Sequence, residues 1–432
     1  MRGMGKIEFA TPADIRGLQE RLLGEHVRYV MERSPYYRRV LKGMEMPDGP
    51  FSLDRLSELP ITDKSAFSDH NDELLAVPMS AIEDIVLSSG TTGRPTRVMY
   101  TRADLDRLAY NEHISFASTG LTADDVVLLT CTIDRCFIAG LAYYLGVRSL
   151  GAAAIRNGLN SLESHAEIIS RLRPTAIVGV PSFLAKLGSY MTDIGRSDEA
   201  ANVRRLICIG EQVRDSDLNP SALGLRLAEA WGGATVFSTY ASSETITSFC
   251  ECTAGRGGHL HPELAVVEIL DDDGNPVSDG EAGEVTVTPL RIEGMPLLRF
   301  RTGDVSFLVN EPCACGRNSA RLGPILGRKK HMMKFRGTTL YPNVIFGVLD
   351  GIAGVREYCL EVSSGDYELS DEVRVLLSVG PEFRGTAVEV MNTLQAGLRV
   401  RPEVRILGDD DIRARVYAGG SRKPIRFMDM RK

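Results

Sequence analysis

The chain has 432 residues, of which 43% are hydrophobic and 25% are charged, and its formal net charge is −7. This length predicts two or three domains, and the composition excludes a disordered chain, a collagen and a coiled coil. The acidic balance provides no global basic field, so we expect no nucleic acid partner. The eight cysteines are too sparse for a disulfide scaffold. We find no secretory signal and no spanning segment, and therefore expect a cytoplasmic protein with no membrane partner.

The first two thirds of the chain predict an α/β arrangement. Residues 12–45 have helical spacing, with a break at Ser34 and Pro35. From residue 82, short apolar runs alternate with amphipathic stretches, which is typical of parallel βαβ units. The expected strands are 82–87, 126–132, 176–180, 206–209 and 235–238, and the expected helices are 102–116, 161–172, 182–195 and 215–230.

The pattern changes after residue 264. Strands at 266–270 and 284–288, joined by a turn at 271–275, predict a β-rich subdomain over about 264–326. Residues 331–432 predict a small α+β domain. Its expected helices are 343–352 and 383–399, and its expected strands are 359–362, 373–379 and 404–407.

A cluster of glycines and hydroxyl side chains follows the first expected strand, at residues 88–96. Glycines let the backbone approach an anion closely, and successive N–H groups form an anion-binding nest. The lysine of a Walker A loop is missing, so the cluster is not that motif. On composition alone, a plain solvated loop is the more frequent outcome.

Four further motifs follow in order. They are Tyr-Ala-Ser-Ser-Glu-Thr at 240–245, Arg-Phe-Arg-Thr-Gly-Asp at 299–304, the basic segment at 327–337, and Gly-Ser-Arg-Lys at 420–423 with Arg426, Asp429 and Arg431. With residues 88–96, this ordered set resembles the motifs of the adenylate-forming (ANL) superfamily, in its phenylacetate–coenzyme A ligase-like branch. Residues 59–64 resemble an N-terminal segment of the same branch. The resemblance implies an adenylation domain over residues 1–326, a hinge at 327–330 and a mobile C-terminal domain over 331–432.

The resemblance also implies a reaction. A carboxylic acid is activated by ATP to an acyl-adenylate and then transferred to coenzyme A as a thioester. Because an anion attacks a polyanion, catalysis is mostly positioning and electrostatics. The implied catalytic residues are Lys423, which reaches the carboxylate and the α-phosphate, Glu244, which binds Mg²⁺, and Thr92. The implied nucleotide-binding residues are Ser88, Ser89, Gly90, Thr91, Thr92, Gly93, Tyr240, Asp304, Arg328 and Lys64.

Each of these side chains has a plain structural alternative. Glu244 is then a solvated carboxylate, Asp304 caps a turn, and Tyr240 is a core ring. Lys423 is then part of a basic tail. The motif context favours the functional interpretation for Glu244, Asp304 and Lys423, and leaves Tyr240 open.

The cysteines predict a second site. Zinc prefers four Cys or His ligands when its role is structural, and two Cys-x-Cys elements with nearby histidines can supply them. The resemblance places the ligands on Cys252, His259, Cys313 and Cys315, with Cys250 and His261 as substitutes. The alternative is a set of buried thiols with surface histidines. The remaining cysteines are expected to be buried apolar side chains, and they are Cys131, Cys136, Cys208 and Cys359.

The resemblance implies an acid pocket lined by Phe137, Gly140, Gly210, Glu211 and Ala241. Phe137 favours an aromatic or other flat acid. The segment 134–136 departs from the glycine-rich sequence expected there, and Ala241 replaces a glycine. These departures weaken the case for phenylacetate itself and favour a hydroxylated or amino-bearing aromatic acid. Arg135 has a plain surface position as its alternative.

The expected ligands are a small carboxylic acid, ATP with Mg²⁺, and coenzyme A. A homodimer is the oligomeric state to be tested. Lys330 stands at the implied hinge position, where only backbone torsions must change. Two alternatives stay open. One is an adenylating enzyme with a non-thiol acceptor such as an amine, and the other is a catalytically silent nucleotide-binding regulator. The presence of Glu244, Asp304 and Lys423 together disfavours the regulator.

Overall fold

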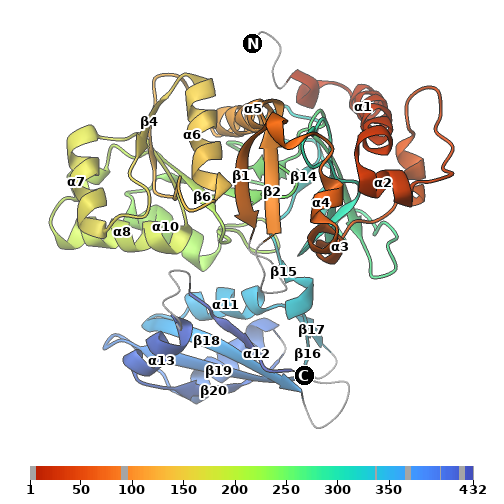
Figure 1. Cartoon of the computed structure of the whole chain (residues 1–432). Coiled ribbons are helices and arrows are strands. Elements are labelled where there is room, and N and C mark those ends of the chain that lie inside the picture. Colours follow the sequence, from red (N-terminus) through yellow and green to blue (C-terminus); the bar gives the residue numbers. More distant parts are fainter. Residues whose placement is uncertain are drawn as a thin grey trace. The chain divides into compact units, whose positions relative to one another are not determined.

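The computed structural model describes residues 6–88, 96–335, 338–364, 371–398, 400–417 and 424–431. The chain forms two compact units (Figure 1). Unit 1 comprises Met1–Pro220 and Gly224–Ile325, and unit 2 comprises Ser221–Leu223 and Leu326–Lys432. The predicted α/β fold class is confirmed, and each unit is built around its own sheets and core.

Unit 1 begins with a helical region. The predicted break at Ser34 is confirmed, because this extended residue ends one helix and its hydroxyl caps the next. The elements are η1 (Lys6–Phe9), α1 (Pro12–Arg33), α2 (Pro35–Val40), η2 (Leu53–Glu58), α3 (Lys64–Asp69), α4 (Asn71–Leu74) and η3 (Met79–Ala81). Their apolar sides form one core with the first strands of the chain.

A six-stranded sheet forms the middle of unit 1, in the order β4-β3-β5-β6-β7-β8. The first five strands are parallel, and β8 is antiparallel to β7. The strands are β3 (Val126–Leu129), β4 (Ala153–Arg156), β5 (Ala176–Gly179), β6 (Arg205–Ile209), β7 (Thr235–Ser242) and β8 (Thr247–Cys250). The helices are α5 (Arg102–Ser118), α6 (Ile138–Leu150), α7 (Leu162–Leu172), α8 (Pro181–Asp193), α9 (Ser197–Ala200) and α10 (Ala222–Ala230).

Two expectations for this region were wrong. The strand expected at 82–87 is β1 (Ile82–Ser88), which pairs antiparallel with β2 (Thr96–Thr101) outside the parallel sheet. The segment 89–95 between them is shorter than the dozen or so residues that a parallel crossover needs. The helix expected from residue 215 begins at Ala222, because the Asp215 carboxylate accepts from Asp217 and Asn219 N–H groups and makes a turn instead.

The predicted β-rich region completes unit 1. β10 (Ala265–Leu270), β11 (Gly283–Pro289) and β12 (Phe300–Ser306) pair antiparallel. The turn predicted at 271–275 is closed by the Asp271 carboxylate, which accepts from the Asn275 N–H at 2.8 Å. A second small sheet contains β9 (Gly258–His259), β13 (Leu308–Val309) and β14 (Arg321–Leu322).

Unit 2 contains a four-stranded mixed sheet in the order β20-β19-β18-β21. β18 and β19 are antiparallel, whereas β20 and β21 run parallel to their neighbours. The strands of this part of the chain, in and outside that sheet, are β15 (Gly327–Arg328), β16 (Met333–Phe335), β17 (Thr338–Leu340), β18 (Val355–Ser364), β19 (Asp371–Val379), β20 (Glu403–Ile406) and β21 (Phe427–Asp429). Its helices are η4 (Lys329–His331), α11 (Pro342–Asp350), α12 (Ala387–Leu398) and α13 (Asp409–Val416).

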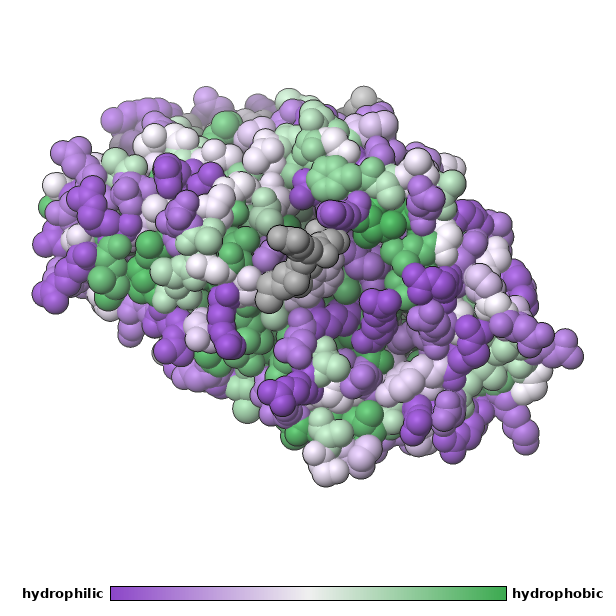
Figure 2. Space-filling model, turned by 90° about the horizontal axis from the view of Figure 1, so that it is seen from above, coloured by the Kyte–Doolittle hydropathy of each residue, from purple (hydrophilic) through white to green (hydrophobic). Residues whose placement is uncertain are grey.

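Hydrophilic residues cover much of the face that Figure 2 shows. Among the described residues, none of the helices combines the length and the apolar character that crossing a bilayer requires.

Candidate active site and metal centre

The predicted phosphate loop follows β1. Ser88 is the last residue of that strand and pairs across the ladder with Thr96, so the two ends of the loop are held together. The other predicted residues of this loop, Ser89, Gly90, Thr91, Thr92 and Gly93, lie outside the described residues. The predicted catalytic residue Lys423 also lies outside them.

Tyr240 and Asp304 meet although they are 64 residues apart in the chain. The Tyr240 hydroxyl donates to Asp304 Oδ2 at 2.9 Å. The tyrosine ring stacks on Phe249 with centroids 6.4 Å apart, and burial raises the pKa of Tyr240 well above its usual value. The Tyr240 hydroxyl therefore stays protonated and donates its hydrogen bond. It orients the carboxylate of Asp304, which the family resemblance implies to be a nucleotide-binding residue.

Glu244 lies in the turn that follows β7. Its Oε2 accepts a hydrogen bond from the Ser242 hydroxyl at 2.9 Å. The turn is held from outside, because the Tyr100 hydroxyl donates to the Ser243 carbonyl at 3.0 Å. Tyr100 comes from β2, so the strand that follows the predicted phosphate loop supports the turn that carries Glu244.

The Arg-Phe-Arg-Thr-Gly-Asp motif begins at Arg299 and continues along β12, and several of its side chains have structural partners. Arg299 is buried and forms two 2.9 Å bonds to Glu268. The Thr302 hydroxyl donates to the Val285 carbonyl at 2.8 Å. Gly303 has φ +74°, a conformation that glycine adopts without strain. These contacts hold the strand that presents Asp304.

Lys64 is brought to the same strand. The Thr62 N–H donates to the carbonyl of Arg299, directly before β12, at 3.2 Å, and the N–H of Arg301 in β12 donates to the Thr62 carbonyl at 2.9 Å. The Asp63 carboxylate then caps α3 at 2.7 Å, and Lys64 is the first residue of that helix. The segment predicted from residues 59–64 therefore lies beside the Asp304 strand.

The predicted acid-pocket residues follow the carboxyl ends of parallel strands, the edge at which open α/β sheets bind ligands. Phe137 and Gly140 follow β3, Gly210 and Glu211 follow β6, and Ala241 lies near the end of β7. Gly210 has φ +75°, and a Cβ there would meet open space. A Cβ on Gly140 would lie 2.0 Å from the Thr132 carbonyl oxygen, so α6 can approach this loop only with glycine at that position.

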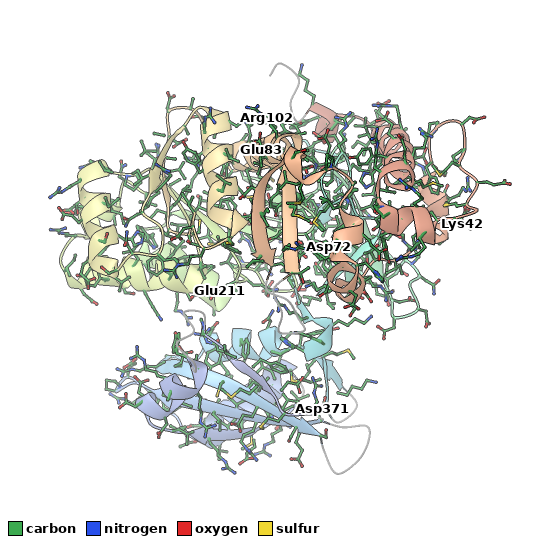
Figure 3. The ribbon with its side chains drawn as sticks, in the orientation of Figure 1. Lys42, Asp72, Glu83, Arg102, Glu211 and Asp371 are labelled. Atoms are coloured by element: carbon green, nitrogen blue, oxygen red, sulfur yellow. The ribbon has the colours of Figure 1, made fainter. Side chains whose placement is uncertain are left out.

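Glu211 has a structural partner for each carboxylate oxygen. They accept from the Ser182 N–H at 2.9 Å and from the Ser182 hydroxyl at 2.8 Å. Figure 3 labels Glu211 near the end of the sheet. The side chain caps the first turn of α8, and this contact fixes the turn that contains Gly210.

Of the cysteines expected to be buried, Cys131, Cys208 and Cys359 are confirmed, whereas the expectation for Cys136 was wrong. Cys136 is exposed because it follows β3 in a loop whose backbone turns out of the core, with φ +52°.

Arg431 is the centre of a hydrogen-bond network within unit 2. Arg328 is exposed on β15. Arg431 bonds to Asp429 at 2.6 Å, to Asp371 at 3.1 Å and to the Met332 carbonyl at 2.7 Å. Figure 3 labels Asp371, the first residue of β19. Arg431 thus ties the C-terminal strand to the segment that follows the predicted hinge.

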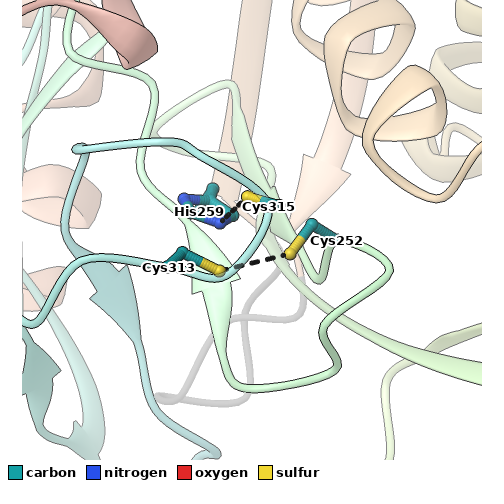
Figure 4. A group of neighbouring side chains, drawn as sticks. All are labelled: Cys252, His259, Cys313 and Cys315. Atoms are coloured by element: carbon teal, nitrogen blue, oxygen red, sulfur yellow. Dashed lines mark hydrogen bonds between the residues drawn. The ribbon is translucent and has the colours of Figure 1, made fainter.

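The structure brings Cys252, His259, Cys313 and Cys315 together in unit 1, with their ligand atoms all within 4.8 Å of one another. Cys252 Sγ and Cys313 Sγ are 3.6 Å apart, and Cys315 Sγ lies 3.4 Å from His259 Nε2. Figure 4 shows Cys313 and Cys315 on one loop, facing Cys252 and His259. Tetrahedral zinc with bonds of about 2.0–2.3 Å spaces its ligand atoms by roughly 3.3–3.8 Å. Both of these measured pairs have that spacing, so the residues present can supply four ligands to one zinc ion.

Outer contacts orient these ligands. His259 Nδ1 lies 3.1 Å from the Ser319 hydroxyl, which leaves Nε2 for the cluster. Burial lowers the pKa of His259 to about 4, so the ring is neutral, as a metal ligand must be. The Arg317 guanidinium donates to Cys315 Sγ at 3.5 Å and to Glu8 Oε2 at 2.5 Å.

The two substitute ligands have other partners. The Thr239 hydroxyl donates to Cys250 Sγ at 3.1 Å inside the sheet. His261 contacts the Glu8 carboxylate and lies 3.1 Å from the Ser115 hydroxyl. Sequence reasoning missed Glu8, a buried residue that joins His261 to Arg317. Its sequence neighbourhood carries no signal of this role.

Comparison with known proteins identifies the family of the chain. Residues 44–289 match the family model described as AMP-binding enzyme. Phenylacetate-coenzyme A ligase from Thermus thermophilus is 32% identical, over 90% of this chain and 86% of the relative. Phenylacetate-coenzyme A ligase from Escherichia coli is 28% identical, over 78% of this chain and 76% of that protein.

A solved structure of 2-hydroxyisobutyryl-CoA ligase, in the postadenylation state with an acyl-AMP, has the same fold. Its TM-score is 0.85 at 22% identity, with 98% of this chain and 91% of that chain covered. The family model matches more than half of the chain, and the Thermus relative covers most of it. The chain therefore belongs to the AMP-binding enzyme family, the adenylate-forming superfamily, in its phenylacetate–coenzyme A ligase-like branch.

Proposed function

We propose that the chain activates an aromatic carboxylic acid with ATP and transfers the acyl group to coenzyme A. The general chemistry is that of its family. An acid displaces pyrophosphate from ATP to give an acyl-adenylate, and a thiol then displaces AMP. The chain is accordingly an AMP-forming acid–thiol ligase. The observation that carries the assignment of the site is the Tyr240–Asp304 contact, which joins two separate family motifs at one place.

In the proposed site, Asp304 accepts hydrogen bonds from the ribose hydroxyls, with Tyr240 holding its carboxylate in place. Ser88 to Gly93 form the nucleotide-binding loop, in which Thr91, Thr92 and Gly93 bind the β- and γ-phosphates, and Thr92 contributes to catalysis. Lys64, beside the Asp304 strand, and Arg328 contribute positive charge near the nucleotide. Lys423 binds the acid carboxylate and the α-phosphate as charge develops. The net charge of −7 makes these local cations and loop donors necessary.

Glu244 is proposed to bind Mg²⁺. Its carboxylate lies in a polar turn with the Ser242 hydroxyl, and hard oxygen ligands suit this ion. The ion, when bound, neutralises charge on the phosphates. The residues of this chain hold the turn in place through Tyr100 and the β7–β8 hairpin.

A structural zinc ion is proposed for Cys252, His259, Cys313 and Cys315. The set supplies four ligands and leaves no open position for water, which is the arrangement of a structural rather than a catalytic site. The centre would join the segment after β8 to the loop that precedes β14.

An aromatic acid is favoured by the half-exposed ring of Phe137 beside the carboxyl end of β3. The relatives named as phenylacetate ligases agree with this class. The departures at 134–136 and at Ala241 favour a hydroxylated or amino-bearing aromatic acid. Reduced thiols fit a cytoplasmic location, and a homodimer stays a prediction for ultracentrifugation.

Pyrophosphate release across a panel of aromatic acids, with and without coenzyme A, tests the proposal. We expect release with an aromatic acid, and thioester only when coenzyme A is present. Release without thioester favours a non-thiol acceptor such as an amine. No release with any acid contradicts the proposal and favours a silent nucleotide-binding regulator.

Lys423→Ala tests the catalytic residue. Adenylation should be lost while ATP still raises the melting temperature, because the lysine acts mainly on the reacting groups. Lys42→Ala, a change at an exposed lysine of α2's flanking turn, is the matched control and should keep full turnover. Unchanged turnover in Lys423→Ala would remove it from the mechanism.

Metal analysis of Cys313→Ser tests the zinc centre. We expect less than about one tenth of the wild-type zinc, because a structural site needs all four ligands and this variant keeps only three of them. Cys359→Ser, a buried thiol of unit 2 outside the cluster, is the control and should keep its zinc. Undiminished zinc in Cys313→Ser would remove that residue from the ligand set.

A further inference from the structure

The loop between β3 and α6 has two consecutive non-glycine residues in the left-handed region. Arg135 has φ +66° and Cys136 has φ +52°. Such a conformation is unfavourable for each residue that has a Cβ. Two in succession mean that other contacts must hold the loop in this shape.

Side chains supply little of this, because the bonds from the Thr132 hydroxyl, to the Asp134 carbonyl at 3.3 Å and to the Asp134 carboxylate, hold the residue before the corner and not the corner itself. The Arg135 side chain is 56% exposed, and it lies 3.9 Å from the carboxylate of Asp134, whose side chain is 77% exposed. Cys136 is exposed, and Phe137 is 39% exposed. Contacts of exposed side chains contribute little free energy, so they do not hold the backbone in one conformation.

The backbone supplies them. The Leu87 N–H donates to the Cys136 carbonyl oxygen at 2.9 Å. Leu87 is the penultimate residue of β1, directly before Ser88 and the predicted phosphate loop. At the other end of the loop, Gly140 lets α6 pack against the Thr132 carbonyl, where any Cβ would clash at 2.0 Å. The left-handed corner is therefore the part of the loop that turns the Cys136 carbonyl onto β1.

We infer that the Arg135–Cys136 corner is a positioning element of the adenylation reaction. It sets the acid-pocket loop against the base of the phosphate loop, so that the carboxylate and the α-phosphate meet at reacting distance. The inference rests on the proposed function, because it takes the loop after β3 as a wall of the acid pocket. Small displacements of reacting groups cost large factors in rate, which gives a backbone hydrogen bond at this place catalytic weight.

Three variants test the inference. Cys136→Gly removes the strain and lets the corner adopt other conformations. Cys136→Asn keeps a left-handed preference without the thiol, since asparagine tolerates that region. Arg173→Gly is the matched control, because Arg173 is another left-handed residue, at φ +46°, that ends α7 on the surface.

Two measurements separate positioning from stability. We expect Cys136→Gly to lower kcat/KM for acid-dependent pyrophosphate release by about tenfold or more, with KM raised for the acid. Its melting temperature should stay at or above that of the wild type, as in Arg173→Gly, which should keep wild-type kinetics. Hydrogen exchange in the peptide over 82–88 should speed up in Cys136→Gly alone. Cys136→Asn should have the kinetics and the hydrogen-exchange rates of the wild type.

Kinetics and exchange in Cys136→Gly that match the wild type would overturn the inference, and so would a failure of Cys136→Asn to restore them. These outcomes presuppose an active wild-type enzyme. A wild type without pyrophosphate release on any acid would instead refute the proposed function, and the positioning role would fall with it.

Discussion

Glu112 is a buried carboxyl group whose protonation should control the stability of unit 1 near neutral pH. It lies on α5, where α6 packs so closely that a Cβ on Gly146 would be 2.3 Å from Glu112 Cβ. Its Oε2 has no hydrogen-bond partner among the described residues. Burial raises the pKa of Glu112 to about 7, and a hydrogen bond with Ser248 and the charge of His261 only partly oppose this.

The sign and size of the effect follow from proton linkage. The folded chain holds the proton up to about pH 7, whereas the unfolded chain releases it near 4.5. The folded state thus binds more protons between these values, so stability falls as pH rises through this window and is level above it. A shift of this size corresponds to about 3 kcal/mol. Glu112→Gln cannot ionise and should lack this fall.

Urea unfolding at several pH values between 4.5 and 8 measures the effect. Trp231 is the single tryptophan of the chain and is buried in unit 1, so its fluorescence reports on that unit. The difference between wild type and Glu112→Gln should change by about 3 kcal/mol between pH 4.5 and 7, whatever constant offset the amide adds. Glu25→Gln, at an exposed position of α1, should run parallel to the wild type. Parallel curves for Glu112→Gln would refute the reasoning.

Three other changes have defined outcomes. Glu268→Gln leaves Arg299 buried without its carboxylate and should cost roughly 3 kcal/mol, read by the same fluorescence; a loss below about 1 kcal/mol would contradict a tightly paired site. Tyr240→Phe removes the donor to Asp304 and should raise KM for ATP roughly tenfold, with KM for the acid unchanged; equal changes in both would argue against a nucleotide role. Chelation of zinc should speed hydrogen exchange in residues 6–11, because Glu8 is tied to the Cys315 loop through Arg317, whereas exchange in α7 should not change. No difference between the two segments would separate the metal centre from the N-terminal segment.

Much of the site could be named before any fold was known. The motifs carry their chemistry in residue types at short spacing, and their order along the chain is as informative as their content. The family resemblance placed the zinc ligands on four residues, and the fold brings the ligand atoms of these same four residues within 4.8 Å of one another. Periodicity likewise predicted β3, β5, β6 and β7 of the parallel sheet, though not β4, and it predicted the break at Ser34.

Contacts between distant residues could not be read in this way. Glu8 and Arg317 are 309 residues apart, and Tyr240 and Asp304 are 64 apart, so no local spacing relates them. From the sequence alone, local periodicity determined the class of fold, and the resemblance of five ordered motifs to a known family indicated the chemistry. Only the tertiary structure decided that β1 leaves the parallel sheet, that Cys136 faces solvent, and that its carbonyl reaches Leu87. Those outcomes depend on which surfaces are buried together, and burial is a property of the whole folded chain.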